Sequence, residues 1–398
     1  MANVSSSNGL EKRPKLRFPG FDEPWRTAQL GDLLIELSDY ATQESGFPLL
    51  TSSRQGLFVQ EDYFTDKQAN AETTVFSVLP YGCITYRHMS DDNIFHFNIN
   101  RLVANGLVSK EYPVFTVRKD VLDTDFLVDT LNSSPLFSVF CIQQKKGGTR
   151  TRLYFKTLCS YQMFLPALHE QQVIASFIRL LDKRIERQVE LVETLKKYKR
   201  GAVDGLLAKK IRFCSRGEWA ELKISDLFSP VSDKGHSDLT VLTIIQGVGT
   251  LPRDCVDRRI MYDKASTNTY KRVEKNDFIL HLRSFEGGLE LANSVGIVSP
   301  AYTILRANKV ISPSFYYAYF RSYWFISNKL RMAVEGIRDG KSINMNTFWN
   351  IAVPYPSLEE QSQIAEYLHA MDLRLSNATQ ELESLIQIRN GLMQQLFI

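Results

Sequence analysis

Residues 165–207 read LPALHEQQVIASFIRLLDKRIERQVELVETLKKYKRGAVDGLL, and residues 355–397 read YPSLEEQSQIAEYLHAMDLRLSNATQELESLIQIRNGLMQQLF. The two stretches align without a gap at a constant offset of 190 residues. Residues identical at this offset include Pro166/Pro356, Leu168/Leu358, Glu170/Glu360, Gln171/Gln361, Ile174/Ile364, Ala175/Ala365, Asp182/Asp372, Arg184/Arg374, Glu193/Glu383, Leu195/Leu385 and Gly201/Gly391. Identities this dense at one offset indicate an internal repeat.

Each copy has the apolar spacing of a long helix. In the second copy the apolar residues step by four and three over about three heptads; they are Ile364, Leu368, Met371, Leu375, Ala378, Leu382 and Leu385. Ser357 and Glu360 form a capping-box pattern that predicts a helix start just after Pro356. The first copy predicts a helix over about 169–200, although Gln188 interrupts its seam and Ala167 replaces the capping serine. A long apolar stripe needs a partner, so we expect the two helices to pair antiparallel.

The charges of the two copies favour the same pairing. Residues 165–213 contain 11 Lys or Arg and six Asp or Glu, a net charge of +5. Residues 355–398 contain two Arg and six Asp or Glu, a net charge of −4. Individual exposed ion pairs contribute only about 0–1 kcal/mol, and the same charges would suit a solvated helix face. Pairing is the interpretation that also explains the apolar seam.

The repeat extends beyond the helices into two globular segments. Trp25/Trp219 and Asp32/Asp226 share an offset of 194 residues. The sequence therefore predicts a flexible tail (1–13), a globular domain (14–157), a helical region (158–211), a second globular domain (212–348) and a second helical region (349–398). We expect an α+β protein: two similar mixed α/β domains separated by two long antiparallel coiled-coil helices, with a pseudo-two-fold internal repeat.

Short runs of strand and helix character are expected inside both domains. β-rich runs bounded by Gly, Pro and Asn occur at Val75–Leu79, Cys83–Tyr86, Phe278–Leu282 and Val295–Val298. The extended run Pro113–Val117 also resembles Pro300–Ile304. Helices are expected at Asp125–Leu131 and Ser314–Asn328. Each domain should surround a small twisted sheet.

Composition excludes several classes of protein. The 398 residues are 44% hydrophobic and 23% charged, as in ordinary globular proteins, which excludes wholesale disorder. The five cysteines form no CxxC pair, which argues against a zinc site or a disulfide scaffold. No apolar run reaches transmembrane length and the N-terminus is polar, so we expect a soluble cytoplasmic protein.

Catalytic motifs are missing from the sequence. It contains no HExxH, GxSxG, P-loop or dinucleotide-binding glycine pattern. We therefore expect a protein without catalytic or metal-binding residues and with no directly bound cofactor.

A Gly-containing basic segment stands at a corresponding position in each domain. Arginine and lysine there could contact phosphates or read guanine, although such loops are often only solvated. The candidate DNA-binding residues are Lys145, Lys146, Thr149, Arg150 and Arg152 in the first domain, and Arg331, Arg338, Lys341 and Asn344 in the second. Arg87 and Arg283, which follow equivalent predicted strands, are weaker candidates.

The arrangement resembles the specificity subunit of type I restriction–modification systems. The resembling residues are Arg17-Phe18-Pro19-Gly20-Phe21 with Trp25, the Pro-x-x-x-Glu-Gln-x-x-Ile-Ala motif beginning at Pro166 and Pro356, and Val298-Ser299-Pro300-Ala301-Tyr302. The duplicated layout is more specific than any single motif, and the resemblance covers nearly the whole chain.

The resemblance implies a non-catalytic reader of double-stranded DNA. Each domain would read one half of a split, asymmetric target, and the paired helices would set the gap between the halves. The helices would also dock two methyltransferase subunits, which carry S-adenosylmethionine, and through them two restriction subunits. The candidate partner-binding residues are Glu170, Gln171, Ile174, Glu360, Gln361 and Ile364.

Two other interpretations remain open at this stage. One is a coiled-coil scaffold with two adaptor-like heads and no DNA role; salt-dependent binding to duplex DNA would distinguish it. The other is an enzyme whose acid and base residues form no recognisable sequence motif.

Overall fold

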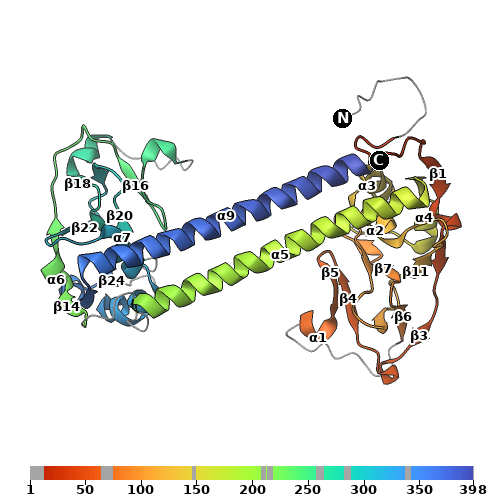
Figure 1. Ribbon diagram of the computed structural model, residues 1–398, viewed down its shortest axis with the longest axis horizontal. Helices are drawn as coiled ribbons and strands as arrows, with labels where there is room; N and C mark the ends of the chain where they lie inside the picture. Colours follow the sequence, from red (N-terminus) through yellow and green to blue (C-terminus); the bar gives the residue numbers. More distant parts are fainter. Residues whose placement is uncertain are drawn as a thin grey trace. The chain divides into compact units, whose positions relative to one another are not determined.

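The computed structural model describes residues 13–63, 75–145, 149–207, 212, 218–256, 264–281, 288–336 and 342–397. The chain forms two compact units. Unit 1 contains Met1–Gln188 and Glu381–Ile398, and unit 2 contains Val189–Gln380. Each unit holds one globular module, called here module 1 (residues 13–165) and module 2 (residues 212–355), and parts of two long helices. The long helices are α5 (Leu168–Leu207) and α9 (Leu358–Leu396) (Figure 1).

Module 1 is a set of small antiparallel sheets with helices at its end. Its strands are β1 (Arg26–Gln29), β2 (Leu34–Glu36), β3 (Tyr40–Ala41), β4 (Leu50–Ser53), β5 (Gly56–Val59), β6 (Phe76–Pro80), β7 (Ile84–Tyr86), β8 (Met89–Ser90), β9 (Phe97–Ile99), β10 (Asn105–Ser109), β11 (Val114–Val117), β12 (Thr151–Arg152) and β13 (Gln162–Leu165). Its helices are α1 (Gln60–Tyr63), α2 (Thr124–Ser133), α3 (Pro135–Gln143) and α4 (Phe155–Cys159). The main sheet has the order β2-β11-β7-β9.

Module 2 repeats this plan with different residues. Its strands are β14 (Ala220–Lys223), β15 (Phe228–Val231), β16 (Leu242–Ile245), β17 (Gly249–Pro252), β18 (Lys271–Val273), β19 (Phe278–His281), β20 (Glu290–Leu291), β21 (Gly296–Val298), β22 (Tyr302–Ala307), β23 (Val334–Glu335), β24 (Ser342–Ile343) and β25 (Ala352–Tyr355). Its helices are α6 (Ile224–Leu227), α7 (Pro313–Phe320) and α8 (Met345–Trp349). The main sheet, β15-β22-β19-β20, matches the order in module 1.

The predicted short elements are found with small shifts, except for the helix over 314–328. That run is helical only to Phe320, and a π-helical turn follows at Phe325–Lys329. Ser322 interrupts it, because its hydroxyl donates to Tyr319 O at 2.7 Å and accepts from Phe325 N at 3.2 Å. A serine that satisfies backbone groups in this way competes with a continuous helix.

The first and last strands of each module lie side by side. Strand β13 pairs antiparallel with β1, and β25 pairs in the same way with β14. These pairings close each module. Strands β13 and β25 lie after the predicted domain ends at residues 157 and 348, within the segments predicted as helical regions.

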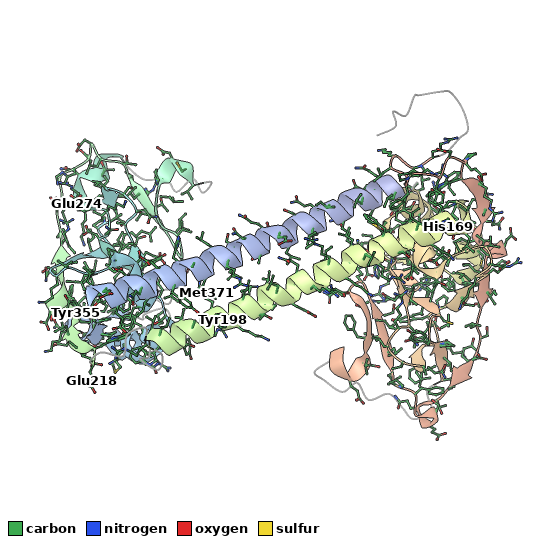
Figure 2. The ribbon with its side chains drawn as sticks, in the orientation of Figure 1. His169, Tyr198, Glu218, Glu274, Tyr355 and Met371 are labelled. Carbon is green, nitrogen blue, oxygen red and sulfur yellow. The ribbon has the colours of Figure 1, made fainter. Side chains whose placement is uncertain are left out.

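The paired helices confirm the predicted antiparallel seam. Every predicted seam residue of α5 and α9 is buried or half-buried. In unit 1, Arg184 Nη2 lies 3.0 Å from Glu381 Oε1, and Arg389 Nε lies 2.5 Å from Asp182 Oδ1. In unit 2, Lys199 is paired with Asp372, on the stretch marked by Tyr198 and Met371 in Figure 2. The start of α9 keeps half of the predicted capping box, since Glu360 N donates to Ser357 Oγ at 3.2 Å.

Each module includes the end of a helix within its core. Met393, Leu396 and Phe397, at the end of α9, belong to the core of module 1. Leu206 and Leu207, at the end of α5, belong to the core of module 2. Phe397 lies 5.6 Å from Phe126 between ring centroids. The core of each module is therefore completed by residues distant in the sequence.

Asp129 of α2 should make unit 1 less stable at high pH. Burial raises the pKa of this carboxyl to about 7, and Asp182 adds to the shift while Arg389 opposes it. The folded protein then binds a proton that the unfolded chain has released, so stability falls as pH rises from about 4 to about 7. We expect Asp129→Asn to stabilise unit 1 at pH 8 by about 1–3 kcal/mol and to flatten this dependence. Urea unfolding at pH 5 and pH 8 measures the change in the free energy of unfolding that Asp129→Asn causes. An equal change at both pH values would contradict the prediction.

Candidate nucleic-acid interface

A buried glutamate near the start of each long helix is hydrogen-bonded to residues of its own module. In unit 1, Arg17 Nε and Nη2 donate to Glu170 Oε1 and Oε2, both at 2.7 Å. Trp25 Nε1 donates to Glu170 Oε1 at 3.3 Å. Glu170 is 1% exposed, so the carboxylate is removed from solvent and satisfied by these donors. Bidentate, charge-assisted hydrogen bonds of this kind fix the relative orientation of the arginine and the carboxylate.

Unit 2 contains the same anchor. Arg212 Nε and Nη2 donate to Glu360 Oε1 and Oε2 at 3.0 and 3.3 Å. Trp219 Nε1 donates to Glu360 Oε2 at 2.8 Å. The guanidinium of Arg212 also lies 5.1 Å from the centre of the Trp219 ring. The repeated Arg, Trp and Glu of the sequence therefore form one structural motif in each half of the chain.

The glutamine that follows each anchor glutamate also joins the helix to its module. Gln171 Oε1 accepts from Asp123 N at 2.8 Å, and its Nε2 donates to Val121 O and Pro166 O at 3.0 Å. Gln361 Oε1 accepts from Ser312 N at 2.8 Å, and its Nε2 donates to Pro356 O at 2.9 Å. Both side chains are buried and are hydrogen-bonded through their oxygen and their nitrogen.

The six predicted partner-binding residues are buried within the two units. They are Glu170, Gln171, Ile174, Glu360, Gln361 and Ile364. The glutamate and glutamine side chains are hydrogen-bonded to the modules, and Ile174 and Ile364 belong to the two hydrophobic cores. Contact of these residues with another subunit stays a prediction.

The basic segment of module 1 is exposed and lies beside an acidic turn. Lys145, Thr149, Arg150 and Arg152 are all exposed. Arg150 Nε lies 2.7 Å from Asp91 Oδ1. Strand β12 pairs with β8, placing Thr151 opposite Ser90. Lys146 lies outside the described residues.

Arg87 lies near the same surface. It follows β7, is exposed, and lines a hollow of about 870 Å³ together with Ser52, Arg54 and Lys110. Arg54 sits in the turn of the β4–β5 hairpin, and its Nη2 lies 2.5 Å from Asp92 Oδ1. The structure thus brings Arg54, Arg87 and the loop 90–94 together around one polar hollow.

The predicted residues of module 2 are less completely described. Arg331 is exposed in a 3-10 turn, Leu330–Ala333. Asn344 caps α8: its Oδ1 accepts from Thr347 N at 3.1 Å, and its Nδ2 donates to Glu335 Oε1 at 2.6 Å. Its side chain is hydrogen-bonded within the chain, and its contact with DNA stays a prediction. Arg283, Arg338 and Lys341 lie outside the described residues.

Sequence reasoning missed Arg54, Asp91 and Asp92. The signal available was the polar run Ser90-Asp91-Asp92-Asn93 between two strands, which resembles an ordinary turn. Only the fold brings it beside Arg54, 38 residues away, and Arg150, 59 residues away. Acidic residues are also not expected on a surface that is predicted to contact DNA.

Two further features of the described residues concern membrane spans and metal sites. In that part of the chain no helix has the length and apolar character needed to cross a bilayer. Within the same ranges, no three His, Cys, Asp or Glu side chains are grouped closely enough to hold a metal ion.

Comparison with protein families gives a match to part of each half of the chain. The model of the family described as "Type I restriction modification DNA specificity domain" matches residues 105–196 and 259–387, more than half of the chain. A curated relative, the "Putative type I restriction enzyme MjaX specificity subunit" of Methanocaldococcus jannaschii, is 21% identical over 343 residues. The alignment covers 78% of each protein.

Solved structures show the same fold along the whole chain. The type I restriction–modification S subunit from M. genitalium superposes with a TM-score of 0.55 at 17% identity, covering 97% of this chain and 99% of that one. The HsdS subunit from Thermoanaerobacter tengcongensis gives a TM-score of 0.51 at 14% identity, covering 98% and 99%. The duplicated arrangement of modules and helices is therefore a known architecture.

Proposed function

Because this chain belongs to the family of type I restriction–modification DNA specificity proteins, we propose that it reads a two-part, asymmetric DNA target, one half with each module. DNA target recognition is the general role of this family, and its members are in general non-catalytic. The division of the target between the two modules is the finer part of this proposal.

The repeated anchor is the observation that carries this proposal. Glu170 and Glu360 hold two modules with the same strand order to the helix pair through identical residue types. The residues at corresponding positions differ, however. The basic segment of module 1 contains Arg150-Thr151-Arg152, whereas the matching strand β24 of module 2 contains Ser342-Ile343. Two modules with the same strand order but different residues at corresponding positions suit two different half-sites.

The long helices are the proposed docking surface for methyltransferase subunits. Beyond their mutual seam they expose large apolar side chains, which water solvates poorly. In unit 1 these include Leu180 and Ile388, and in unit 2 Leu373 and Tyr198. The methyltransferase subunits would hold S-adenosylmethionine and methylate adenine, and restriction subunits would join through them. These side chains are exposed, whereas the six candidate residues of the sequence motif are buried.

Exchange of one module tests the proposal. Residues 17–165 would be replaced by the corresponding module of another family member, so that β13 is kept with β1. We expect one half of the methylated DNA motif to change and the other half to stay the same. Sequencing methylated genomic DNA from cells that express the chain with its methyltransferase measures this. The matched control exchanges residues 218–355 and should change the other half only.

Two results would contradict the proposal. A change in both halves after a single exchange would show that the modules do not read independently. Methyl transfer from labelled S-adenosylmethionine to DNA by the purified chain alone would show that it is itself an enzyme. A complete absence of DNA binding would instead favour a scaffold.

A further inference from the structure

We propose that Asp91 and Asp92 are positioning residues for base reading in module 1. They orient the guanidinium groups of Arg150 and Arg54, so that these arginines contribute sequence selectivity more than general attraction to DNA. The proposal rests on the proposed function, in which module 1 reads one half of the target.

Asp92 is itself held firmly in the turn that joins β8 to β9. Its Oδ1 accepts from Ser90 Oγ at 2.8 Å and from Ile94 N at 3.2 Å. The same oxygen accepts from Arg54 Nη2 at 2.5 Å. A carboxylate fixed by its own turn restricts the arginine that it contacts. Arg54 is thereby oriented although it sits at the tip of a hairpin and its side chain is 57% exposed.

Asp91 holds the second arginine from the neighbouring strand. Arg150 Nε donates to Asp91 Oδ1 at 2.7 Å. The contact is supported next to it, where Thr151 Oγ1 lies 2.5 Å from Asn93 Oδ1 and Thr151 pairs with Ser90. Two adjacent carboxylates of one turn therefore pair with arginines from two separate segments, and Arg54 and Asp91 line the hollow.

Stability of the fold does not explain these pairs. The side chains of both pairs are between 46% and 70% exposed, and exposed ion pairs contribute only about 0–1 kcal/mol. Arginine carries five N–H donors, so a carboxylate that uses one leaves others for a base. Guanine offers two acceptors in the major groove that suit a guanidinium fork. Because the arginine side chains are already oriented before DNA binds, binding also costs less side-chain entropy.

The net charge of each Arg–Asp pair also favours a role in sequence selectivity over a role in general attraction to DNA. A paired arginine and aspartate carry no net charge, so they add little to the release of counterions from DNA. The Arg54 hydrogen bond, with help from Ser90, lowers the pKa of Asp92 to about 2, so this carboxylate stays ionised at any physiological pH. In contrast, Arg87 and Lys110 bring positive charge to the same hollow and suit phosphate contacts.

The test compares target and unrelated DNA over a range of salt concentrations. The full chain, assembled with its methyltransferase partner, is titrated with a duplex that carries its methylated motif and with one that lacks it. For Asp91→Asn and for Asp92→Asn we expect about a tenfold loss of the preference for the target. Binding to unrelated DNA should become stronger and its salt dependence steeper, because one arginine charge is released.

Arginine variants and a matched acidic variant complete the design. Arg54→Ala and Arg150→Ala should weaken binding to the target at least tenfold while the salt dependence hardly changes. Arg87→Ala should weaken binding to both duplexes equally and reduce the salt slope by about one. Asp125→Asn is the control, because Asp125 is also paired with an arginine of module 1, Arg101, away from the hollow. It should leave the preference unchanged.

The outcomes separate this proposal from the proposed function. If Asp91→Asn and Asp92→Asn change binding to both duplexes by the same factor, the two carboxylates act only through charge and the proposal is wrong. It is also wrong if Asp125→Asn produces the same loss of preference. If the unaltered complex does not prefer its own target, the proposed function fails, and this proposal fails with it.

Discussion

Replacing Glu170 by alanine is expected to lower the free energy of unfolding of unit 1 by about 3–5 kcal/mol, because it leaves a guanidinium without its buried partner. Arg17 loses two hydrogen bonds of 2.7 Å, and the Trp25 indole N–H loses its acceptor. Glu360→Ala should have the same effect in unit 2, through Arg212 and Trp219. Hydrogen exchange of the amides of β11 and β22 would follow the two units separately in mild denaturant.

The control for this prediction lies on the same helix. Glu186 of α5 is exposed, and Glu186→Ala should change stability by no more than about 0.5 kcal/mol. Replacing Arg17 and Glu170 together by leucine should cost much less than the sum of the two single changes, because no unpaired charge remains. If Glu170→Ala costs no more than Glu186→Ala, the anchor does not hold the helix to its module.

Replacing Phe397 by alanine should destabilise unit 1 by about 3–5 kcal/mol although the residue is nearly 400 positions from the start of the chain. Phe397 is 4% exposed and packs in the core of module 1 against Phe126. Its loss would leave a cavity among aromatic side chains that cannot collapse fully. Chemical denaturation, followed by hydrogen exchange in each unit, would show which unit is affected.

Two control variants help to interpret the effect of Phe397→Ala on stability. Leu207→Ala removes the corresponding side chain at the end of α5 and should destabilise unit 2 instead. Ile388→Ala, on α9 in unit 1, removes a side chain that is 53% exposed and should have little effect. Destabilisation of unit 2 by Phe397→Ala would contradict the assignment of the helix end to module 1.

The sequence by itself determined the duplication, the two long helices and the seam between them. These features depend on local spacing: apolar residues repeated at steps of four and three specify a helical face whatever surrounds it. The seam residues from Ile364 to Leu385 are accordingly buried or half-buried as predicted. Most short strands were also predictable, since β-rich runs bounded by turn residues are local signals.

Only the tertiary structure decided what the most prominent motif does and which residues surround the basic segment. Glu170 meets Arg17 across 153 residues, and Arg150 meets Asp91 across 59. Spacing within a helix cannot show whether its polar residue faces solvent, another subunit or its own module. For the same reason β13 and Phe397 could not be assigned to module 1 in advance: strand pairing and core packing join distant segments, and no local pattern records their partners.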